Sequence, residues 1–388
     1  MKFQNKISRT VKVALFLLTV MLSCIVLQYY FLRNTDSNSL RVEGFYQEQH
    51  DSLDVVFIGA SDIYTSFMPG RAYEKYGFTS YVLASESITS EGVKTAVKEA
   101  VRTQHPGMIV VEANAFLYGN SNNDANQAYI HKFFDNLPLT VNKLDYILNQ
   151  VPVDQRWEYI FPLIKYHGLW TEFPERIYMT ANNLWLDVRG FNYFKGFTTT
   201  AKVFKPTVKS KNAELPFEDG MLDLDPKLEA QLIDLLEFCQ NNNVKIMFVR
   251  APHFVIDKTY DRVKRSNTMA MIVNEYGFPY YSAEMEAVEP ELNIDENKDF
   301  YNEDHMNVYG ALKFTDYLSE RIVNYEELEI DPLTKDQRDT WKEIASSTNK
   351  LYRYCDDLMK KGEVRSVQED VITLSELGNY SGDPIKTK

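Results

Sequence analysis

Residue types that often reveal a function are scarce in this sequence. Only three cysteines occur among 388 residues, and Cys24, Cys239 and Cys355 are too scattered for a disulfide framework or a metal site. Basic residues number 42 against 55 acidic ones, and the resulting net charge of −13 argues against a nucleic-acid partner, which requires a basic surface. The stretch IGASD lacks the glycine spacing that cradles phosphate, so a nucleotide-binding enzyme is a poor interpretation. We therefore predict no metal, no cofactor and no nucleic-acid partner.

The longest apolar run lies near the N-terminus. VALFLLTVMLSCIVLQYYFL, residues 13–32, contains no charge and is long enough as a helix to span the roughly 30 Å hydrocarbon layer. It follows a tail, residues 1–12, that contains Lys2, Lys6, Arg9 and Lys12. The positive-inside rule then predicts a single-pass anchor in the cell membrane, with a cytoplasmic N-terminus and an extracellular C-terminal domain.

Two other interpretations fit this run less well. A cleaved signal peptide has a shorter apolar stretch that ends in small residues, whereas this one ends in QYYFLRN. A lipoprotein signal through MLSC at Cys24 is disfavoured because the apolar run continues beyond that cysteine. The uncleaved anchor is the expected form.

Short apolar runs alternate with helical patterns after residue 45. The runs predict five strands: LDVVFIGAS (53–61), TSYVLAS (79–85), GMIVVEANAF (107–116), VKIMFVRAP (244–252) and FPYYSA (278–283). Helical spacing of apolar residues is found at 91–104, 225–243, 261–276 and 309–325. This alternation predicts an α/β fold, a three-layer sandwich with a central parallel sheet.

The same pass along the chain suggests its organisation. Residues 33–45 are polar and are expected to form a linker, followed by a main domain over 46–325. An aromatic-rich stretch, 120–220, interrupts the alternation, and we expect an insertion over one end of the sheet, with most of its rings in a small second core. Residues 326–388 are expected to form an amphipathic helical appendage.

Two distant residues suggest a chemistry. Active sites of open parallel sheets lie at the carboxyl ends of the strands, and Ser61 follows the first predicted strand. A serine hydroxyl needs a base to become a nucleophile, and His305, in the loop before the last helix, is the candidate. Ser61 can alternatively be a helix cap, as serines commonly are.

The residues around these two positions resemble the SGNH/GDSL hydrolase superfamily. The first block of that superfamily is similar to Gly59, Ala60 and Ser61, and its last block is similar to FYNEDHMNVYG, with His305 and Asn307 in place. In this last block Asn302 occupies the position at which the superfamily has an aspartate. The likeness covers about residues 50–325 and implies an SGNH/flavodoxin-like fold.

The resemblance also implies roles for further residues. Asn302 or Asp304 would orient the imidazole of His305, and Asn114 stands where the family has an oxyanion-hole amide. Asn114 can equally be a turn former. The second family block lacks its glycine, so a backbone N–H of Ser85, or of residues 86 or 87, would serve instead.

Arg250 near the end of the fourth predicted strand and His253 just after it are expected at the same edge of the sheet. Arg250 and His253 are candidate substrate-binding groups, because an arginine suits phosphate or carboxylate.

The likeness is closest to membrane-anchored members, such as the extracytoplasmic protein of teichoic-acid D-alanylation and the alginate O-acetylation proteins. It implies an esterase or O-acyltransferase that acts on an acylated envelope polymer or a small acyl ester, with a membrane-bound O-acyltransferase as a possible partner. A catalytically inactive scaffold that binds an envelope glycan or such an acyltransferase is the alternative.

Overall fold

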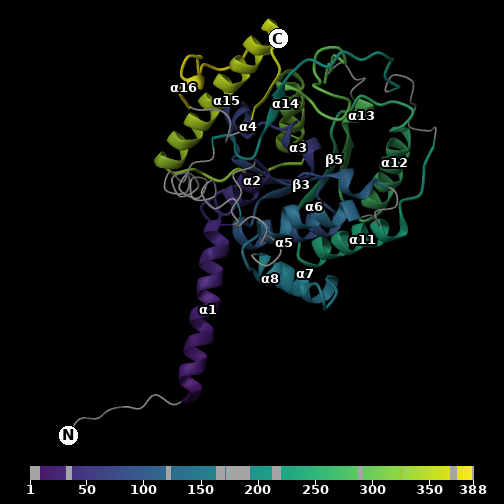
Figure 1. The fold of residues 1–388 in the computed structure, drawn as a ribbon. Helices are drawn as coiled ribbons and strands as arrows, with labels where there is room; N and C mark the ends of the chain where they lie inside the picture. Colours follow the sequence, from purple (N-terminus) through teal and green to yellow (C-terminus); the bar gives the residue numbers. More distant parts are fainter. Residues whose placement is uncertain are drawn as a thin grey trace. The chain divides into compact units, whose positions relative to one another are not determined.

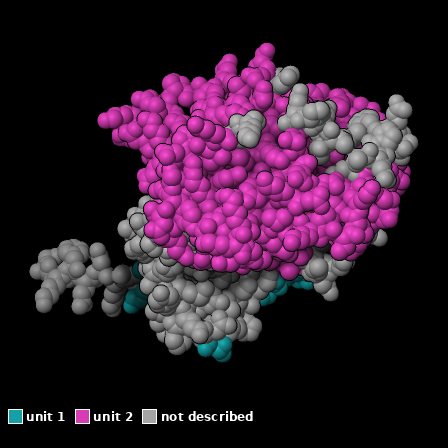
Figure 2. Space-filling model, turned by 90° about the horizontal axis from the view of Figure 1, so that it is seen from above, with its two compact units in different colours: residues 1–35, 138–191 teal, residues 36–137, 192–388 magenta. Residues whose placement is uncertain are grey.

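The computed structural model describes residues 9–31, 37–118, 124–162, 171, 193–211, 220–286, 292–324, 326–367 and 374–386. The chain divides into two compact units, which Figure 2 shows in different colours. Unit 1 comprises residues 1–35 and 138–191, and unit 2 comprises residues 36–137 and 192–388.

Unit 1 is helical where it is described. Its helices are α1 (Arg9–Phe31), α7 (Val141–Gln150) and α8 (Arg156–Ile160). The Thr140 side chain caps α7 by accepting a hydrogen bond from the Lys143 backbone N–H at 3.1 Å. Tyr146 of α7 and Tyr159 of α8 pack edge to face, with ring centroids 6.0 Å apart.

The predicted membrane segment, residues 13–32, lies almost entirely in α1. Several large apolar side chains of this helix are exposed, including Phe16, Leu17 and Leu22. Across the part of the chain that the structure describes, no helix meets both the length and the apolarity needed to cross a membrane. The anchor therefore stays a prediction.

Unit 2 is built on a central sheet of five parallel strands, as the sequence predicts. The strands are β1 (Val55–Gly59), β2 (Ser80–Ala84), β3 (Met108–Glu112), β5 (Ile246–Arg250) and β6 (Tyr280–Ser282). Their order in the sheet is β2-β1-β3-β5-β6, with Val55 opposite Ser80 and Met108, Ile109 opposite Ile246, and Phe248 opposite Tyr280. All five predicted strands are thus confirmed.

The first strand shows why these segments are strands. Every residue of β1 is buried, as expected for a parallel sheet covered on both faces, and its β-branched residues suit such a surface. Val55 and Phe57 face a hydrophobic cluster that also contains residues of α14. Gly59 ends the strand, and a Cβ at this position would lie 2.7 Å from Glu112 Cβ. The absence of a side chain at Gly59 lets β1 and the end of β3 approach closely.

Helices cover the sheet and extend beyond it. Those of unit 2 are α2 (Ser37–Phe45), α3 (Ser61–Tyr64), α4 (Pro69–Tyr76), α5 (Ser90–Gln104), the 3₁₀ turn η1 (Ala113–Phe116), α6 (Asp124–Phe134), α11 (Pro226–Asn241), α12 (Tyr260–Glu275), α13 (Ala283–Glu286), α14 (Val308–Asn324), α15 (Lys335–Lys361) and α16 (Leu374–Leu377). Figure 1 shows α5 and α11 on one side of the sheet, with α4 and α14 on the other. This layering is consistent with a three-layer sandwich.

The strand order decides where a ligand can reach the sheet. From β1 the chain first crosses to β2 on one side, and then returns to β3 on the other side of β1. In open parallel sheets the crevice for a ligand lies at such a reversal, outside the carboxyl ends of the strands. Here it lies beyond Gly59 and Glu112.

The structure differs from the sequence prediction over part of the expected linker. Residues 37–45 of the predicted linker 33–45 form α2, in which Arg41, Val42 and Phe45 are buried. Arg41 Nε donates to the Gly196 carbonyl at 2.7 Å, and Tyr81 OH donates to the Arg41 carbonyl at 2.8 Å. These contacts are made with residues far along the chain, which explains why the local polar composition was misleading.

The C-terminal segment 326–388 contains the predicted amphipathic helix. This helix, α15, begins with a capping box of Thr334 and Gln337 and ends at Gly362 in the left-handed region, φ 74°. Its apolar face contacts α4 and α14. After it, β7 (Arg365–Val367) pairs antiparallel with β4 (Thr199–Ala201), so the appendage belongs to unit 2.

Much of the aromatic-rich stretch 120–220 lies outside the described residues. The described parts contain α6, α7, α8 and β4.

Candidate active site

Ser61 lies where the sequence predicts, directly after β1 as the first residue of α3. Ala60 before it has an extended backbone, φ −95° and ψ −157°, so the chain turns sharply at the carboxyl edge of the sheet. The serine is half-buried. Burial raises the pKa of the Tyr64 phenol, and the Arg41 guanidinium and a hydrogen bond with Ser61 partly oppose this. The Ser61 hydroxyl therefore lies next to the Tyr64 phenol.

His305 lies in a tight loop before α14. The Tyr301 N–H donates to the His305 carbonyl at 3.0 Å, and the two rings stack with centroids 5.3 Å apart and planes 6° from parallel. The Phe254 N–H donates to the Glu303 carbonyl at 2.8 Å, which fixes this loop beside the chain that leaves β5. His305 is thus held at the same carboxyl edge of the sheet as Ser61.

Asn302 fixes the protonation pattern of the His305 ring. Asn302 Oδ1 accepts hydrogen bonds from the Asp304 backbone N–H at 3.0 Å and from His305 Nδ1 at 2.9 Å. Because a backbone N–H can only donate, the side-chain atom at this position must be the amide oxygen, and Nδ1 must then bear the hydrogen. The other ring nitrogen, Nε2, has its lone pair available.

The electrostatics of His305 agree with this arrangement. Burial lowers the pKa of His305 below its ordinary value, while the negative charges of Asp62 and Asp304 act in the opposite direction. The ring is therefore neutral at pH 7. Nε2 is buried and has no hydrogen-bond partner among the described residues, so no such bond joins it to the Ser61 hydroxyl.

Asp304 does not orient the imidazole, contrary to one of the two expectations. Its carboxylate faces Arg262 at 3.4 Å and is partly exposed. Only its backbone N–H contacts Asn302. Of these two candidates, Asn302 is the one that bonds to the ring.

Asn114 and Ser85 are not placed as the resemblance implies. Asn114 Nδ2 donates to Asp62 Oδ2 at 2.8 Å and to Tyr118 OH at 3.0 Å, which uses both amide hydrogens. The Ser85 N–H donates to the Gly59 carbonyl at 3.2 Å. Neither group is available to a substrate oxygen in this conformation.

One backbone amide of the second block is not engaged within the described residues. The Glu86 N–H donates to Asn38 Oδ1 at 2.8 Å, whereas the Ser87 N–H has no partner within the described ranges. Ser87 has φ 50°, in the left-handed region that favours glycine. The sequence lacks the glycine of the family's second block, although the backbone at Ser87 adopts a conformation that glycine favours.

Arg250 and His253 do not line a substrate site. Arg250, the last residue of β5, is 1% exposed and contacts Glu112 Oε1 at 3.2 Å and Glu284 Oε1 at 2.9 Å. His253 is 3% exposed, and its Nε2 lies 2.5 Å from Asp62 Oδ1. On its other side Nδ1 lies 2.6 Å from the Ala251 carbonyl and 3.0 Å from Glu284 Oε1. These residues form a buried ion network, and the substrate-binding prediction is corrected accordingly.

The ion network consists of Asp62, Glu112, Arg250, His253 and Glu284. Burial and the Arg250 charge lower the pKa of His253, but hydrogen bonds to Asp62 and Glu284 outweigh them and raise it to about 9. Burial acts to raise the pKa of Glu284, but the Arg250 charge and the hydrogen bond from His253 bring it down to about 2. Burial likewise acts to raise the pKa of Asp62, and His253 holds it well below its usual range.

Glu112 balances the charge of the network. Burial and the negative charge of Asp62 raise the pKa of Glu112 to about 7. Below that pH two cations, Arg250 and His253, face two carboxylates, Asp62 and Glu284. A buried cluster of this kind is stable only when its charges are paired.

Three members of the network were not predicted from the sequence. Asp62, Glu112 and Glu284 each stand within three residues of the carboxyl end of a strand. Acidic residues stand within three residues of four of the five strand ends, since Glu86 follows β2, and this signal was present in the sequence. Across the described residues, no group of three or more histidine, cysteine or acidic side chains is arranged to hold a metal ion.

No protein-family model matches the chain, and no curated protein is significantly similar to it. The resemblance to the SGNH/GDSL superfamily accordingly stays a prediction that depends on the motif residues.

The chemistry of the site follows from its groups. A hydroxyl at Ser61 and a neutral imidazole at His305, with a free lone pair on Nε2, occupy the same edge of the sheet. Buried polar atoms of three surrounding residues, Ser85 Oγ, Asn114 Oδ1 and His305 Nε2, have no hydrogen-bond partner among the described residues. Catalytic hydrogen bonds are often long or poorly aligned before substrate binds, so the missing bond between Ser61 and His305 does not by itself exclude a catalytic pair.

Proposed function

We propose that the protein is an extracytoplasmic serine esterase or O-acyltransferase of the SGNH/GDSL type, which acts on acyl esters of a cell-envelope polysaccharide or teichoic-acid-like polymer. The observation that carries this proposal is the fixed tautomer of His305. Asn302 holds the hydrogen on Nδ1, so Nε2 is an unprotonated base at the edge where Ser61 emerges. The strand order, which reverses next to this edge, supports an SGNH/flavodoxin-like fold.

The proposed reaction has two halves. Ser61 Oγ attacks the ester carbonyl carbon while His305 Nε2 accepts the hydroxyl proton, and the Ser87 N–H donates to the oxyanion. Collapse of the tetrahedral intermediate breaks the ester bond, and the imidazolium gives its proton to the leaving alcohol. A water molecule or a polymer hydroxyl then attacks the acyl-serine, with His305 again as the base.

Asn302 limits the rate of this reaction. Its carbonyl oxygen orients the imidazole but contributes no full negative charge, and the loss of that charge in a serine triad costs on the order of 10⁴ in rate. Burial lowers the pKa of His305, and the buried carboxylate of Asp62 partly opposes this. Asp62 therefore stabilises the imidazolium in part.

Membrane anchoring through residues 13–32 is part of the proposal. The uncharged run, the basic residues before it and the exposed apolar side chains of α1 support it. In this arrangement unit 2 faces the cell envelope, and a membrane-bound O-acyltransferase is a partner that could supply or receive the acyl group.

Labelling with a fluorophosphonate tests the nucleophile. The full-length chain in detergent is expected to be labelled at Ser61, and Ser61→Ala is expected to lose the label. The matched control is Ser52→Ala, because the Ser52 hydroxyl bonds only to the Gln49 carbonyl away from the site. Labelling that persists in Ser61→Ala would reject Ser61 as the nucleophile.

A catalytically inactive scaffold is the second candidate. It is favoured by the missing hydrogen bond between Ser61 and His305 and by the commitment of the Asn114 amide to Asp62 and Tyr118. The two candidates differ in their response to Asn302→Asp. An active site gains esterase activity from the added charge, whereas a scaffold that only binds a glycan or an acyltransferase gains none.

A further inference from the structure

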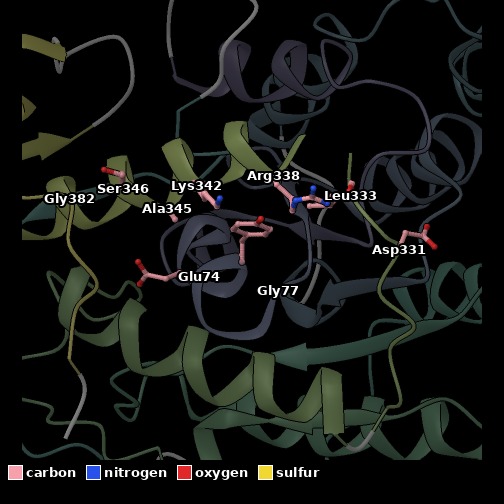
Figure 3. Close-up of a pocket in the computed structure, with 10 residues that line it drawn as sticks. Glu74, Gly77, Asp331, Leu333, Arg338, Lys342, Ala345, Ser346 and Gly382 are labelled. Atoms are coloured by element: carbon pink, nitrogen blue, oxygen red, sulfur yellow. Dashed lines mark hydrogen bonds between the residues drawn. The ribbon is translucent and has the colours of Figure 1, made fainter. Parts of the chain in front are cut away.

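A cavity of about 500 Å³ lies in unit 2 between α4, the chain before α15, α15 itself and the C-terminal segment. Its walls include Tyr73 and Glu74 of α4, Asp331, Arg338 and Lys342. Figure 3 shows Arg338 and Lys342 on the wall formed by α15, and Asp331 at the far end of the cavity from Lys342. This volume suits a ligand of the size of one or two sugar units.

The two cations offer unused hydrogen-bond donors. Arg338 and Lys342 are four residues apart on α15 and so lie on one face of the helix. Among the described residues the side chain of Arg338 donates only to the Leu333 carbonyl, through Nη1. Lys342 Nζ lies 3.6 Å from its nearest carboxylate, Asp339, and both of these side chains are largely exposed.

The acidic side chains of the cavity differ in their availability. Glu74 is already engaged, because it accepts hydrogen bonds from Arg71 Nη1 at 3.2 Å and Asn349 Nδ2 at 2.7 Å. The Asp331 backbone N–H donates to Asp54 Oδ1, but the carboxylate of Asp331 has no partner among the described residues. The cavity thus presents the two cations along its α15 wall, and toward one end Asp331, whose carboxylate has no partner among the described residues.

An aromatic wall joins the two ends. The Tyr73 ring packs on the buried Trp341 with centroids 5.3 Å apart, which holds it in place. Burial raises the pKa of the Tyr73 phenol, and the nearby Arg338 charge opposes this. The phenol hydroxyl makes no hydrogen bond to the described residues, so it adds a further group for a ligand.

We propose that this cavity binds an anionic sugar, with its carboxylate or phosphate at Arg338 and Lys342 and its hydroxyls donating to Asp331. An acceptor-rich anion satisfies the unused donors, and a guanidinium and an ammonium are both suited to it. Hydroxyl groups on the same molecule satisfy Asp331. The chain as a whole has a net charge of −13 and repels anions, whereas the two cations on this cavity wall attract an anion locally. The site does not depend on the chemistry proposed for Ser61.

The test is titration calorimetry on the full-length chain in detergent, with D-glucuronate, D-glucose 1-phosphate and D-glucose as probes. Saturable binding of one or both anions is expected, with D-glucose at least about tenfold weaker, since each charge-assisted hydrogen bond contributes about that factor. The two anions distinguish a carboxylate ligand from a phosphate ligand. Absence of saturable binding for both anions, or equal binding of D-glucose, overturns the proposal.

Two double variants distinguish binding at the cavity from a general effect of the net charge of the protein. The double variant Arg338→Gln/Lys342→Gln is expected to weaken anion binding about tenfold or more. Its matched control is Lys360→Gln/Lys361→Gln, which removes the same charge from the other end of α15, where the lysines pair with Asp356 and Asp357. Equal weakening in the control overturns the proposal. Ser61→Ala is expected to bind as the unmodified chain does, so failure of the proposed reaction leaves this result unaffected.

Discussion

Two histidines at the same edge of the sheet have opposite surroundings. His253 has both ring nitrogens engaged by Asp62, Glu284 and a backbone carbonyl, and it is charged at neutral pH. His305 has one nitrogen engaged by the neutral Asn302 and the other without a partner in the described parts of the chain, and it is uncharged.

The difference shows how environment separates a structural histidine from a candidate base. For a buried imidazole between two carboxylates, the attraction between the protonated ring and the carboxylates exceeds the cost of desolvating the positive charge. Such a ring stays protonated and cannot act as a base near pH 7. A buried imidazole next to a neutral amide has no such attraction to offset the cost of desolvating a positive charge. It therefore remains neutral and can accept a proton. Five predictions test this comparison, from the largest expected effect to the smallest.

His305→Ala is expected to slow fluorophosphonate labelling of Ser61 by about 10²–10⁴-fold, the usual contribution of a general base. The control is His105→Ala. His105 also has Nδ1 bonded to an oxygen, Asp51 Oδ1 at 2.8 Å, but it is exposed. Equal labelling rates for His305→Ala and the unmodified chain would remove His305 from the mechanism.

Glu284→Ala is expected to lower the free energy of unfolding by about 3–5 kcal/mol, because it leaves Arg250 and His253 buried with one carboxylate fewer. The control is Asp304→Ala, which removes a partly exposed acid and is expected to change stability by at most about 1 kcal/mol. Urea denaturation measures both. A loss at Glu284 no greater than that at Asp304 would show that the network is not structural.

The pH dependence of labelling should follow His305. Because only the neutral ring accepts a proton, the rate is expected to rise with pH through the lowered pKa of His305, with the midpoint of the rise below pH 6.5. Asn302→Asp adds a carboxylate to Nδ1, which is expected to move this inflection upward by about 1–2 pH units. An inflection that does not move in Asn302→Asp contradicts the assigned role of residue 302.

The ion network predicts a smaller effect on stability. The folded state raises the pKa of His253 from 6.5 to about 9, so it binds the proton more tightly than the unfolded chain does. This stabilisation is complete below pH 6.5 and is lost as the pH rises through about 9. The melting temperature is therefore expected to fall over this window.

Glu112 extends the same trend to lower pH. Its pKa is raised from 4.5 to about 7 in the folded state, so stability falls as the pH rises from 4.5 through about 7. Glu112→Gln imitates the protonated form and is expected to remove this part of the decline. If the melting temperature of Glu112→Gln still declines between pH 4.5 and 7 as steeply as that of the unmodified chain, Glu112 is not the cause of the decline.

Local sequence patterns were sufficient to predict the strands of the sheet and one contact between side chains. The short apolar and aromatic runs predicted all five strands, and the position of Ser61 directly after a strand followed from the same pattern. The contact between Asn302 and His305 was also predictable, because the two residues are three apart in one loop. Such interactions depend on short stretches of chain, where spacing decides which atoms can meet.

Contacts between distant residues were predicted poorly. Arg250 ends a strand and was expected to face a ligand, but it is surrounded by Glu112 and Glu284 from neighbouring strand ends. Residues 37–45 have a polar composition, but they form α2, in which several residues are buried. Arg41 of this helix bonds to Gly196 and to Tyr81, which lie far from it along the chain.

The sequence by itself determined the strands, the carboxyl edge and the candidate nucleophile and base on it. Only the tertiary structure decided which side chains at that edge are paired and which are available. Asp62 and His253 are 191 residues apart, and they meet because the order of the strands brings the ends of β1 and β5 together on either side of β3. Charge, burial and proton affinity depend on such neighbours, and the sequence does not state which neighbours a residue will have.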